Sequence, residues 1–115
     1  VYNKENDKFE SFTKVGTGFT DKQFEDISGK LKKLELKEKS DRVKIKKQMY
    51  PDTYYEPELV AEIMGAEITR SPAHYVAVKE GKGLALRFPR FLQLREDKSP
   101  EQATTVKEVK QLKNK

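Results

Sequence analysis

Residues 83–98 alternate basic and aromatic side chains, and they are the part of the chain best suited to carry chemistry. Such interleaving is typical of nucleic-acid binding, in which cations contact phosphates while a ring lies against a sugar or a base edge. The residues that carry the pattern are Arg87, Phe88, Arg90, Phe91, Arg95 and Lys98.

The same segment also fits an ordinary β-strand. Alternate side chains of a regular strand face opposite sides of the sheet. One face would then carry the four leucines of the segment together with Phe88, and the other would carry Arg87, Phe91 and Arg95. Pro89 removes a ladder donor and indicates a bulge or a sheet edge. The alternation alone therefore leaves open whether Phe88 is buried or exposed.

Composition excludes several classes of protein. The chain has 115 residues, no Cys and a single His, His74, for which we expect a core or loop position. Thiolate metal sites and cysteine nucleophiles are excluded, and one histidine cannot by itself build a zinc site or a hydrolase triad. We predict no metal site. No apolar run approaches the ~18 residues of a membrane span, and no basic leader precedes an apolar segment, so we expect a soluble, single domain with no membrane partner.

Positive charge is concentrated in the middle of the chain. The formal net charge is +5, and residues 30–50 alone carry nine Lys or Arg against three Asp or Glu. Such clustering is typical of proteins that bind a polyanion, most often nucleic acid, although a solvated lysine-rich face produces the same excess. The abundance of Lys and Glu without Trp or Cys is also typical of thermophile proteins.

The first third predicts a β-hairpin followed by a helix. Residues 9–15 alternate as in a strand and are expected to pair with the first two residues. Thr20 and Gln23 have capping-box spacing, which predicts that a helix begins at Asp21. This helix should cover a core with one apolar face, made of Phe24, Ile27, Leu31 and Leu34.

The remainder of the chain predicts more short strands and a final helix. Residues 42–46 alternate as in a half-buried strand, and residues 49–57 form a proline-punctuated loop. Residues 59–69 fit a strand with a bulge near Gly65, although a helix over 57–64 fits as well. Two further strands are predicted at 74–78 and 84–95, around a turn at Gly81–Gly83. Capping-box patterns after residue 98 predict a short terminal helix with an apolar stripe of Val106, Val109 and Leu112.

These elements favour a small, mainly β fold. Five or so short strands, one helix after the first hairpin and a short C-terminal helix suit a five-stranded Greek-key oligonucleotide-binding (OB) barrel. An SH3-like barrel or a small α+β sandwich would use similar elements.

Three blocks of the sequence resemble one family, the ATP-dependent DNA ligases of the archaeal and eukaryotic replicative type. RFPRFLQLREDKSPEQATT, from residue 87 onward, resembles motif VI and its sequel in that family. KVGTGFTD at 14–21 is similar to the segment that opens the family's C-terminal OB domain, and YPDTYYEP at 50–57 is similar to a loop of that domain. The resemblance implies an OB-fold domain over residues 1–98, with motif VI at 87–98, and a C-terminal helical extension over 99–115.

The resemblance implies part of an enzyme that seals nicks in duplex DNA through enzyme-AMP and DNA-AMP intermediates. In the family, the Arg and Lys of an R-x-D-K element reach the pyrophosphate that leaves ATP, and the matching residues here are Arg95 and Lys98, with Asp97 as an orienting partner. Cations aimed at developing phosphate charge are the main help that a second domain can give to nucleotidyl transfer. Taken alone, the same residues would fit a surface turn of ion pairs worth about 0–1 kcal/mol each. The chain contains no K-x-D-G sequence, so we expect it to be inactive without the domain that carries the adenylylated lysine.

The resemblance also implies contacts with DNA. Phe88 is expected in the minor groove beside the nick, with Arg87 and Arg90 near the backbone, because a wedge of this kind favours a widened groove. Lys14 is a candidate phosphate contact, although a solvated lysine fits equally well.

For the full-length enzyme the resemblance implies ATP and Mg²⁺, nicked duplex DNA, and a nucleotidyltransferase domain of the same chain as partner. We expect roles in DNA replication, repair and recombination, in the archaeal cytoplasm or the eukaryotic nucleus, with a sliding clamp as a further candidate partner. The terminal helix resembles an extension that holds the nucleotidyltransferase domain closed, with its lysines at that interface.

Two other functions use the same kind of barrel. One is a stand-alone protein that binds single-stranded nucleic acid, and the other is the equivalent domain of an RNA capping guanylyltransferase. The chain begins at Val1 inside a predicted strand, as expected for the C-terminal piece of a longer protein; a K-x-D-G domain upstream would identify the ligase.

Overall fold

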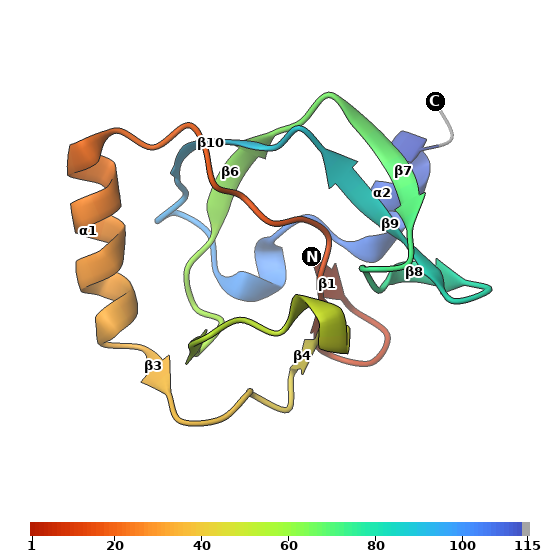
Figure 1. The fold of residues 1–115 in the computed structure, drawn as a ribbon, viewed down its shortest axis with the longest axis horizontal. Coiled ribbons are helices and arrows are strands. Elements are labelled where there is room, and N and C mark those ends of the chain that lie inside the picture. Colours follow the sequence, from red (N-terminus) through yellow and green to blue (C-terminus); the bar gives the residue numbers. More distant parts are fainter. Residues whose placement is uncertain (114–115) are drawn as a thin grey trace.

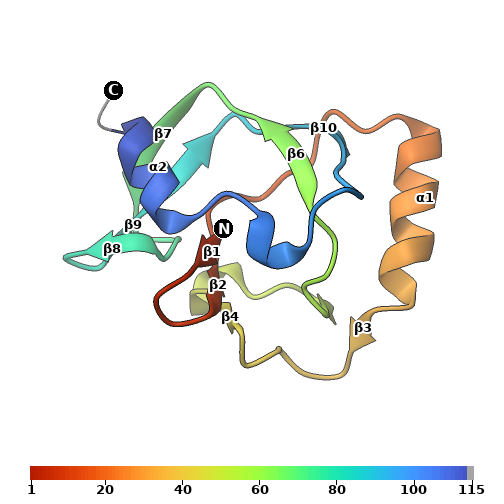
Figure 2. The ribbon, with the colours of Figure 1, turned by 180° about the vertical axis from the view of Figure 1, so that it is seen from behind.

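The computed structural model describes residues 1–113, which form short strands and two helices, and the two helices lie far apart on different sides of the strands (Figures 1 and 2). The strands are β1 (Tyr2–Asn3), β2 (Lys8–Glu10), β3 (Glu35–Leu36), β4 (Val43–Lys44), β5 (Tyr54–Tyr55), β6 (Ala61–Met64), β7 (Glu67–Ser71), β8 (Val76–Lys79), β9 (Lys82–Arg87) and β10 (Arg90–Leu94). The helices are α1 (Asp21–Lys32) and α2 (Val106–Lys113), with 3-10 turns at Lys47–Met49 and Pro100–Gln102. No helix within these residues is long and apolar enough to cross a membrane.

The predicted N-terminal hairpin is present, but its second strand is shorter than expected. β1 and β2 pair antiparallel, with Tyr2 opposite Phe9, and β4 joins β2 in parallel. β2 ends at Glu10 rather than at residue 15. The next residues bond to two different sheets instead: the amide of Ser11 donates to Lys44, whereas the carbonyl of Phe12 accepts from Leu86. Residues 11–12 therefore connect the hairpin sheet to the β7-β9-β8 sheet.

Helix α1 begins at Asp21, as the capping box predicts. The amide of Gln23 donates to Thr20 Oγ1 over 3.1 Å, and the amide of Thr20 donates to Gln23 Oε1 over 3.0 Å. The helix ends at Lys32, so Leu34 lies beyond it, which corrects the expected length of the apolar stripe. The expectation that the stripe covers a core is also wrong, because no α1 residue is buried and Phe24 is 62% exposed.

The segment after α1 contains strands that the sequence did not indicate. β3 pairs antiparallel with β5, so residues expected to form only a loop contribute to a sheet. Tyr54 and Tyr55 are half-buried in this pair. The predicted strand at 42–46 shrinks to the two residues of β4.

The centre of the fold is a two-stranded antiparallel ribbon. One side of it is β6 followed by β7, the other side is β9 followed by β10, and the ribbon bends where both sides are interrupted. β10 pairs with β6, and β9 pairs with β7; Met64 lies opposite Arg90 and Glu67 opposite Arg87. The predicted bulge at Gly65 is therefore confirmed as the break between β6 and β7, visible as a corner in Figure 1. A Cβ on Gly65 would collide with the side chain of Leu86, so this close crossing requires glycine.

The hydrophobic core lies between α2 and the β7-β9-β8 sheet. Its fully buried members are Val76, Leu84 and Val109. The capping box at Thr105 starts α2 as predicted, since the amide of Glu108 donates to Thr105 Oγ1 over 3.2 Å. The predicted stripe of α2 is only partly correct, because Leu112 is 55% exposed.

The 3-10 turn before α2 is tied to the N-terminal hairpin through Arg42. One Nη of Arg42 lies 2.7 Å from a carboxylate oxygen of Asp7 and 3.1 Å from one of Glu101. Its guanidinium also lies over the ring of Phe9, with 4.9 Å between the guanidinium carbon and the ring centroid. The C-terminal segment is thus attached to the β-structure both by core packing and by ion pairs.

The β-class prediction is confirmed, and the arrangement of the sheets is looser than a barrel. Strand pairing within residues 1–113 gives four sheets, in the orders β1-β2-β4, β10-β6, β3-β5 and β7-β9-β8, and these do not join into a closed ring. The five-stranded Greek-key barrel therefore stays a prediction.

Replacing Val109 with Ala should lower the free energy of unfolding by about 2 kcal/mol, because a fully buried side chain would be replaced by a cavity. Leu112→Ala on the exposed face of the same helix should change it by less than about 0.5 kcal/mol. Urea denaturation measures both. Equal effects of the two substitutions would mean that α2 does not pack on the sheet through Val109.

Candidate functional site

The segment that contains Lys14 runs directly alongside the segment that contains Phe88. Thr13 Oγ1 donates to the carbonyl of Leu86 over 2.9 Å, and Thr17 Oγ1 donates to that of Pro89 over 3.1 Å. The amide of Phe91 donates to the carbonyl of Thr17 over 2.9 Å. Two of the sequence blocks singled out above, 14–21 and the start of 87–105, are therefore parts of one surface.

Phe88 lies at the interruption between β9 and β10 with its ring in solvent. It is 70% exposed, and its backbone has a φ of 56°. Positive φ in a bulky residue costs roughly 1–3 kcal/mol and persists only where the surroundings impose it, as at many functional sites. The strand alternation that would bury Phe88 is therefore broken at this residue, and the exposed position expected from the resemblance is the observed one.

The interruption reverses the faces of the residues that follow. Phe91, which strict alternation places with the arginines, is only 3% exposed. Its ring stacks on that of Phe19 with centroids 4.4 Å apart and 11° between the planes. Phe91 therefore anchors the start of β10 in the fold, while Phe88 points outward.

Three cations belong to the two segments that meet at Phe88. Arg87, Arg90 and Lys14 are all exposed, and the guanidinium carbon of Arg87 lies 5.5 Å from the centroid of the Phe88 ring. Within residues 1–113, no carboxylate lies within ion-pairing distance of these three side chains. An exposed ring with one guanidinium beside it, on a surface that carries two further unpaired cations, is the kind of arrangement that can contact a duplex groove and its phosphates.

Arg95 and Asp97 lie at the other end of β10 and form a bidentate pair. Arg95 Nε and Nη2 donate to the two carboxylate oxygens of Asp97 over 3.0 and 2.8 Å. This pairing lowers the pKa of Asp97 to about 2, so the carboxylate is ionised throughout the neutral range. Arg95 Nη1 also lies 3.7 Å from a carboxylate oxygen of Glu62. The guanidinium is held in one orientation and is not buried.

Lys98 completes the turn that follows β10. Its amide donates to the carbonyl of Arg95 over 3.2 Å, which places both residues on one tight turn. Its side chain is exposed, and within residues 1–113 no carboxylate lies within 4.0 Å of its ammonium. The turn thus presents one cation that is already engaged, Arg95, and one that is available to an external anion.

The two groups of cations lie at opposite ends of one strand. Arg90 and Arg95 are five residues apart along β10, which an extended strand spans in roughly 16 Å. A single phosphate cannot contact both ends. The structure therefore separates the candidate DNA contacts from the candidate pyrophosphate contacts.

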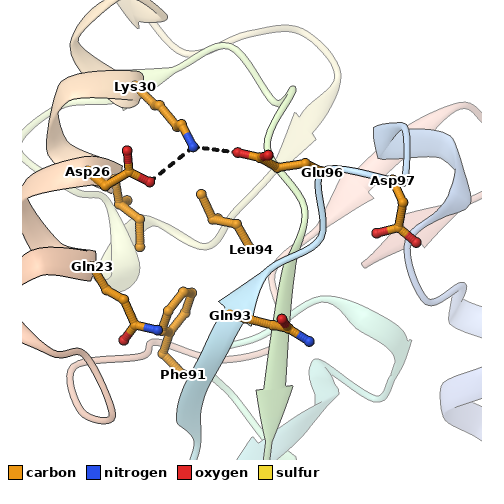
Figure 3. Close-up of a pocket in the computed structure, with 9 residues that line it drawn as sticks. Gln23, Asp26, Lys30, Phe91, Gln93, Leu94, Glu96 and Asp97 are labelled. Carbon is orange, nitrogen blue, oxygen red and sulfur yellow. Dashed lines mark hydrogen bonds and ion pairs between the residues drawn. The ribbon is translucent and has the colours of Figure 1, made fainter.

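A pocket of about 280 Å³ lies between α1 and the segment after β10 (Figure 3). Lys30 reaches across it, with Nζ 3.0 Å from Asp26 and 2.5 Å from Glu96. Figure 3 shows Asp97 pointing away from this pair. The carboxylates outnumber the lysine, so the pocket does not suit a phosphate. We interpret it as the place where α1 supports the turn that carries Arg95.

The residues present do not fit a protein-bound magnesium ion. Within residues 1–113, no three His, Asp or Glu side chains come together in a way that could hold a metal. Any Mg²⁺ used by a longer protein would need ligands other than a cluster of these side chains in residues 1–113.

Other residues that the sequence singled out lie away from these two groups. His74 is buried, its Nδ1 lies 3.1 Å from Ser11 Oγ, and burial lowers its pKa, so it is a core histidine as expected. The basic stretch 30–50 is partly engaged, since Lys30 and Arg42 form ion pairs. For the remaining lysines, a solvated face and a contact with nucleic acid both stay predictions.

Sequence reasoning missed the residues that position the site. Glu62 contacts Arg95, and Thr17 contacts Pro89 next to Phe88, through pairing between segments more than 30 residues apart. Thr17 belongs to the 14–21 block, but the sequence assigned no role to either residue. The stacking of Phe19 on Phe91 was also missed, although both belong to the blocks singled out. The strand pairing β6–β10, had it been known, would have pointed to Glu62.

Comparison with known proteins gives consistent matches along the chain. Residues 1–98 match a family model described as "ATP dependent DNA ligase C terminal region". "DNA ligase 1" of Methanosarcina mazei is 51% identical over 115 residues, covering 99% of this chain and 20% of the relative. The protein of the same name from Methanosarcina acetivorans is 50% identical, covering 98% and 20%. "DNA ligase" of Saccharolobus islandicus is 45% identical, covering 100% and 19%. The chain thus spans about a fifth of the length of these relatives.

Gly18→Ala should lower the free energy of unfolding by about 2 kcal/mol. Gly18 has a φ of 96°, and an added Cβ would collide with the backbone of Phe91, so the 14–18 segment would have to move away from β10. Gly16→Ala is the matched control, because an added Cβ there meets nothing within 4 Å. Urea denaturation compares the two; a Gly18→Ala variant as stable as Gly16→Ala would contradict the close packing of these segments.

Proposed function

Because this chain belongs to the family of ATP-dependent DNA ligase C-terminal regions, we propose that it is the DNA-binding and ATP-closing domain of a ligase that seals nicks in duplex DNA. Residues 1–98 would form the OB-fold domain, and residues 99–115 the C-terminal extension. The five-stranded Greek-key barrel would arise from the bent β6–β7 and β9–β10 ribbon together with the hairpin sheet, joined through residues 11–12.

One observation carries the proposal: two separate groups of cations lie at the two ends of β10. At its start, Phe88 is exposed beside Arg87, and the adjoining segments also expose Arg90 and Lys14, which supports insertion of the ring into a minor groove. At its end, Arg95 and Lys98 share an exposed turn. A domain that only bound single strands would need the first group and have no use for the second, and the match to ligases does not favour that alternative.

The proposed chemistry at the second group concerns the first step of ligation. A lysine of the nucleotidyltransferase domain attacks the α-phosphorus of ATP, a nitrogen–phosphorus bond forms, and the bond to the bridging oxygen of pyrophosphate breaks. Negative charge accumulates on the leaving pyrophosphate. Arg95, oriented by Asp97, and Lys98 would neutralise that charge, which is the kind of help that pre-oriented cations give to phosphoryl transfer.

The first group would serve the two later steps. AMP passes from the lysine to the 5′-phosphate of the nick, and the 3′-hydroxyl then attacks that phosphate and releases AMP. Neither step needs an acid or base from this chain. Phe88 would occupy the groove beside the nick while Arg87, Arg90 and Lys14 contact the backbone phosphates, which positions the two DNA ends.

The remaining proposals concern the whole enzyme, of which this chain is about a fifth by length of its relatives. We propose ATP and Mg²⁺ as its cofactors, its own nucleotidyltransferase domain and nicked duplex DNA as its partners, and a cytoplasmic location in an archaeon or a nuclear one in a eukaryote. A sliding clamp is a further proposed partner, and thermophily a further proposed property.

Arg95→Ala and Lys98→Ala in the full-length enzyme should each slow enzyme-AMP formation by about 10- to 100-fold, because each removes a cation from the leaving pyrophosphate. Sealing of a pre-adenylylated nick, which needs no ATP, should stay within about twofold of the unaltered enzyme. Rapid-quench assays of both steps make the measurement, with Lys79→Ala on β8 as a control for the loss of one surface charge. An equal loss in both steps would contradict the assigned role.

Charge reversal of Lys107 and Lys110 should slow enzyme-AMP formation by about 3- to 10-fold, if the extension docks on the nucleotidyltransferase domain through its lysines. Both side chains are exposed, so α2 can keep Val109 in the core, whereas deletion of residues 104–115 would remove that residue. Reversal of Lys4 and Lys79 gives the same change in net charge elsewhere on the surface. The same rate in both double variants would count against an interface at α2.

A further inference from the structure

We infer that Thr17 is a positioning residue that holds Phe88 in its outward orientation for DNA binding. The inference rests on the proposed function of Phe88 as a groove contact. Thr17 lies within the 14–21 block, but the resemblance assigns it no role, and its hydroxyl contacts one point of the β9–β10 connection, the carbonyl of Pro89.

Hydrogen bonds from other segments hold the backbone before and after Phe88. On one side, the carbonyl of Arg87 accepts from the amide of Ala66 over 2.9 Å. On the other side, the carbonyl of Pro89 accepts from Thr17 Oγ1 over 3.1 Å. Between these two bonds the chain passes through the φ of 56° at Phe88.

Proline transmits the second bond to Phe88. The pyrrolidine ring fixes φ of Pro89 at about −65°, so ψ of Pro89 is the one soft dihedral between its carbonyl and the peptide that joins it to Phe88. Holding the carbonyl therefore restricts that peptide more closely than it would at another residue type. Without the Thr17 hydroxyl, ψ of Pro89 is less restricted, and Phe88 can relax from a backbone region that bulky residues avoid. The side chain would then sample other directions, and binding would have to select the outward one.

The backbone bond nearby does not replace this contact. The amide of Phe91 donates to the carbonyl of Thr17, which fixes the start of β10 but lies on the far side of Arg90 from Phe88. Phe91 is further held by its stacking on Phe19. Loss of the Thr17 hydroxyl should therefore loosen Phe88 and Pro89 and leave the fold around Phe91 intact.

The chain contains a matched control for this bond. Thr13 is four residues earlier on the same segment, and its Oγ1 donates to the carbonyl of Leu86 over 2.9 Å. This bond has the same chemistry, but it precedes Phe88 and acts on β9, whose ladder to β7 already holds Leu86 opposite Ile68. Thr13→Val therefore removes an equivalent bond without freeing Phe88.

The test uses the full-length enzyme and a 5′-adenylylated nicked duplex, without ATP. Fluorescence anisotropy measures the dissociation constant, and a single-turnover assay at saturating enzyme measures the sealing rate. Thr17→Val should weaken binding by about 3- to 10-fold, the effect of one lost hydrogen bond, with a smaller effect on the sealing rate. Thr17→Ser, which keeps the hydroxyl, should restore binding, and Thr13→Val should bind like the unaltered enzyme. Enzyme-AMP formation and the thermal unfolding midpoint should be unchanged in Thr17→Val.

A double-mutant cycle separates a role through Phe88 from a general structural role. Phe88→Ala should weaken binding, and Thr17→Val should then have no further effect in the Phe88→Ala background. Three outcomes would overturn the inference and leave the proposed function unchanged. They are additive losses in the double variant, an equal loss of binding in Thr13→Val, and normal binding by Thr17→Val when Phe88→Ala binds weakly. Normal binding by Phe88→Ala would instead remove the proposed role of Phe88 in DNA binding, and the inference with it.

Discussion

The backbone reversal at Phe88 and Pro89 is the constraint on which both faces of the domain depend. A positive φ at Phe88 sends one ring into solvent and, three residues later, lets Phe91 turn inward and stack on Phe19. The reversal occurs opposite Gly65, where β6 ends and β7 has not yet begun. Both strands of the ribbon are therefore interrupted at the same position, and the ribbon bends there. Strand β10 then starts from a fixed anchor. The turn with Arg95 and Lys98 follows the other end of β10, so the position of Phe91 determines the direction in which β10 carries that turn.

Surrounding elements serve mainly to keep this geometry. The 14–18 segment bonds to the connection from one side, and α1, which follows it directly, reaches the other end of β10 through Lys30 and Glu96. Exposed ion pairs of this kind contribute about 0–1 kcal/mol each. Their value here is orientation rather than stability. The core itself lies elsewhere, around Val76, Leu84 and Val109, so the functional strand is supported by backbone hydrogen bonds and one aromatic stack.

Local signals in the sequence predicted the elements that depend on local physics. The capping boxes at Thr20 and Thr105, the break at Gly65 and the interruption at Pro89 are all effects of a few neighbouring residues, and each was located correctly. The β3–β5 pair, the early end of β2 and the Thr17 bond arise from contacts between distant segments, which periodicity does not encode. The apolar face of α1 misled for a related reason: its spacing indicated burial, yet within residues 1–113 no element covers Phe24. For the site, the residue types and their order were readable, whereas the separation of the two cation groups along β10 needed coordinates.

The bidentate pair between Arg95 and Asp97 affects which anions can bind to the guanidinium of Arg95. Asp97 is a carboxylate tethered two residues away, so it competes for the guanidinium at a high effective concentration. An anion that binds Arg95 has to displace this carboxylate, whereas Lys98 beside it has no such competitor among residues 1–113. Under the proposed function, a polyphosphate that contacts both cations would therefore compete better than an anion with a single charge. After the pyrophosphate leaves, Asp97 would pair with Arg95 again.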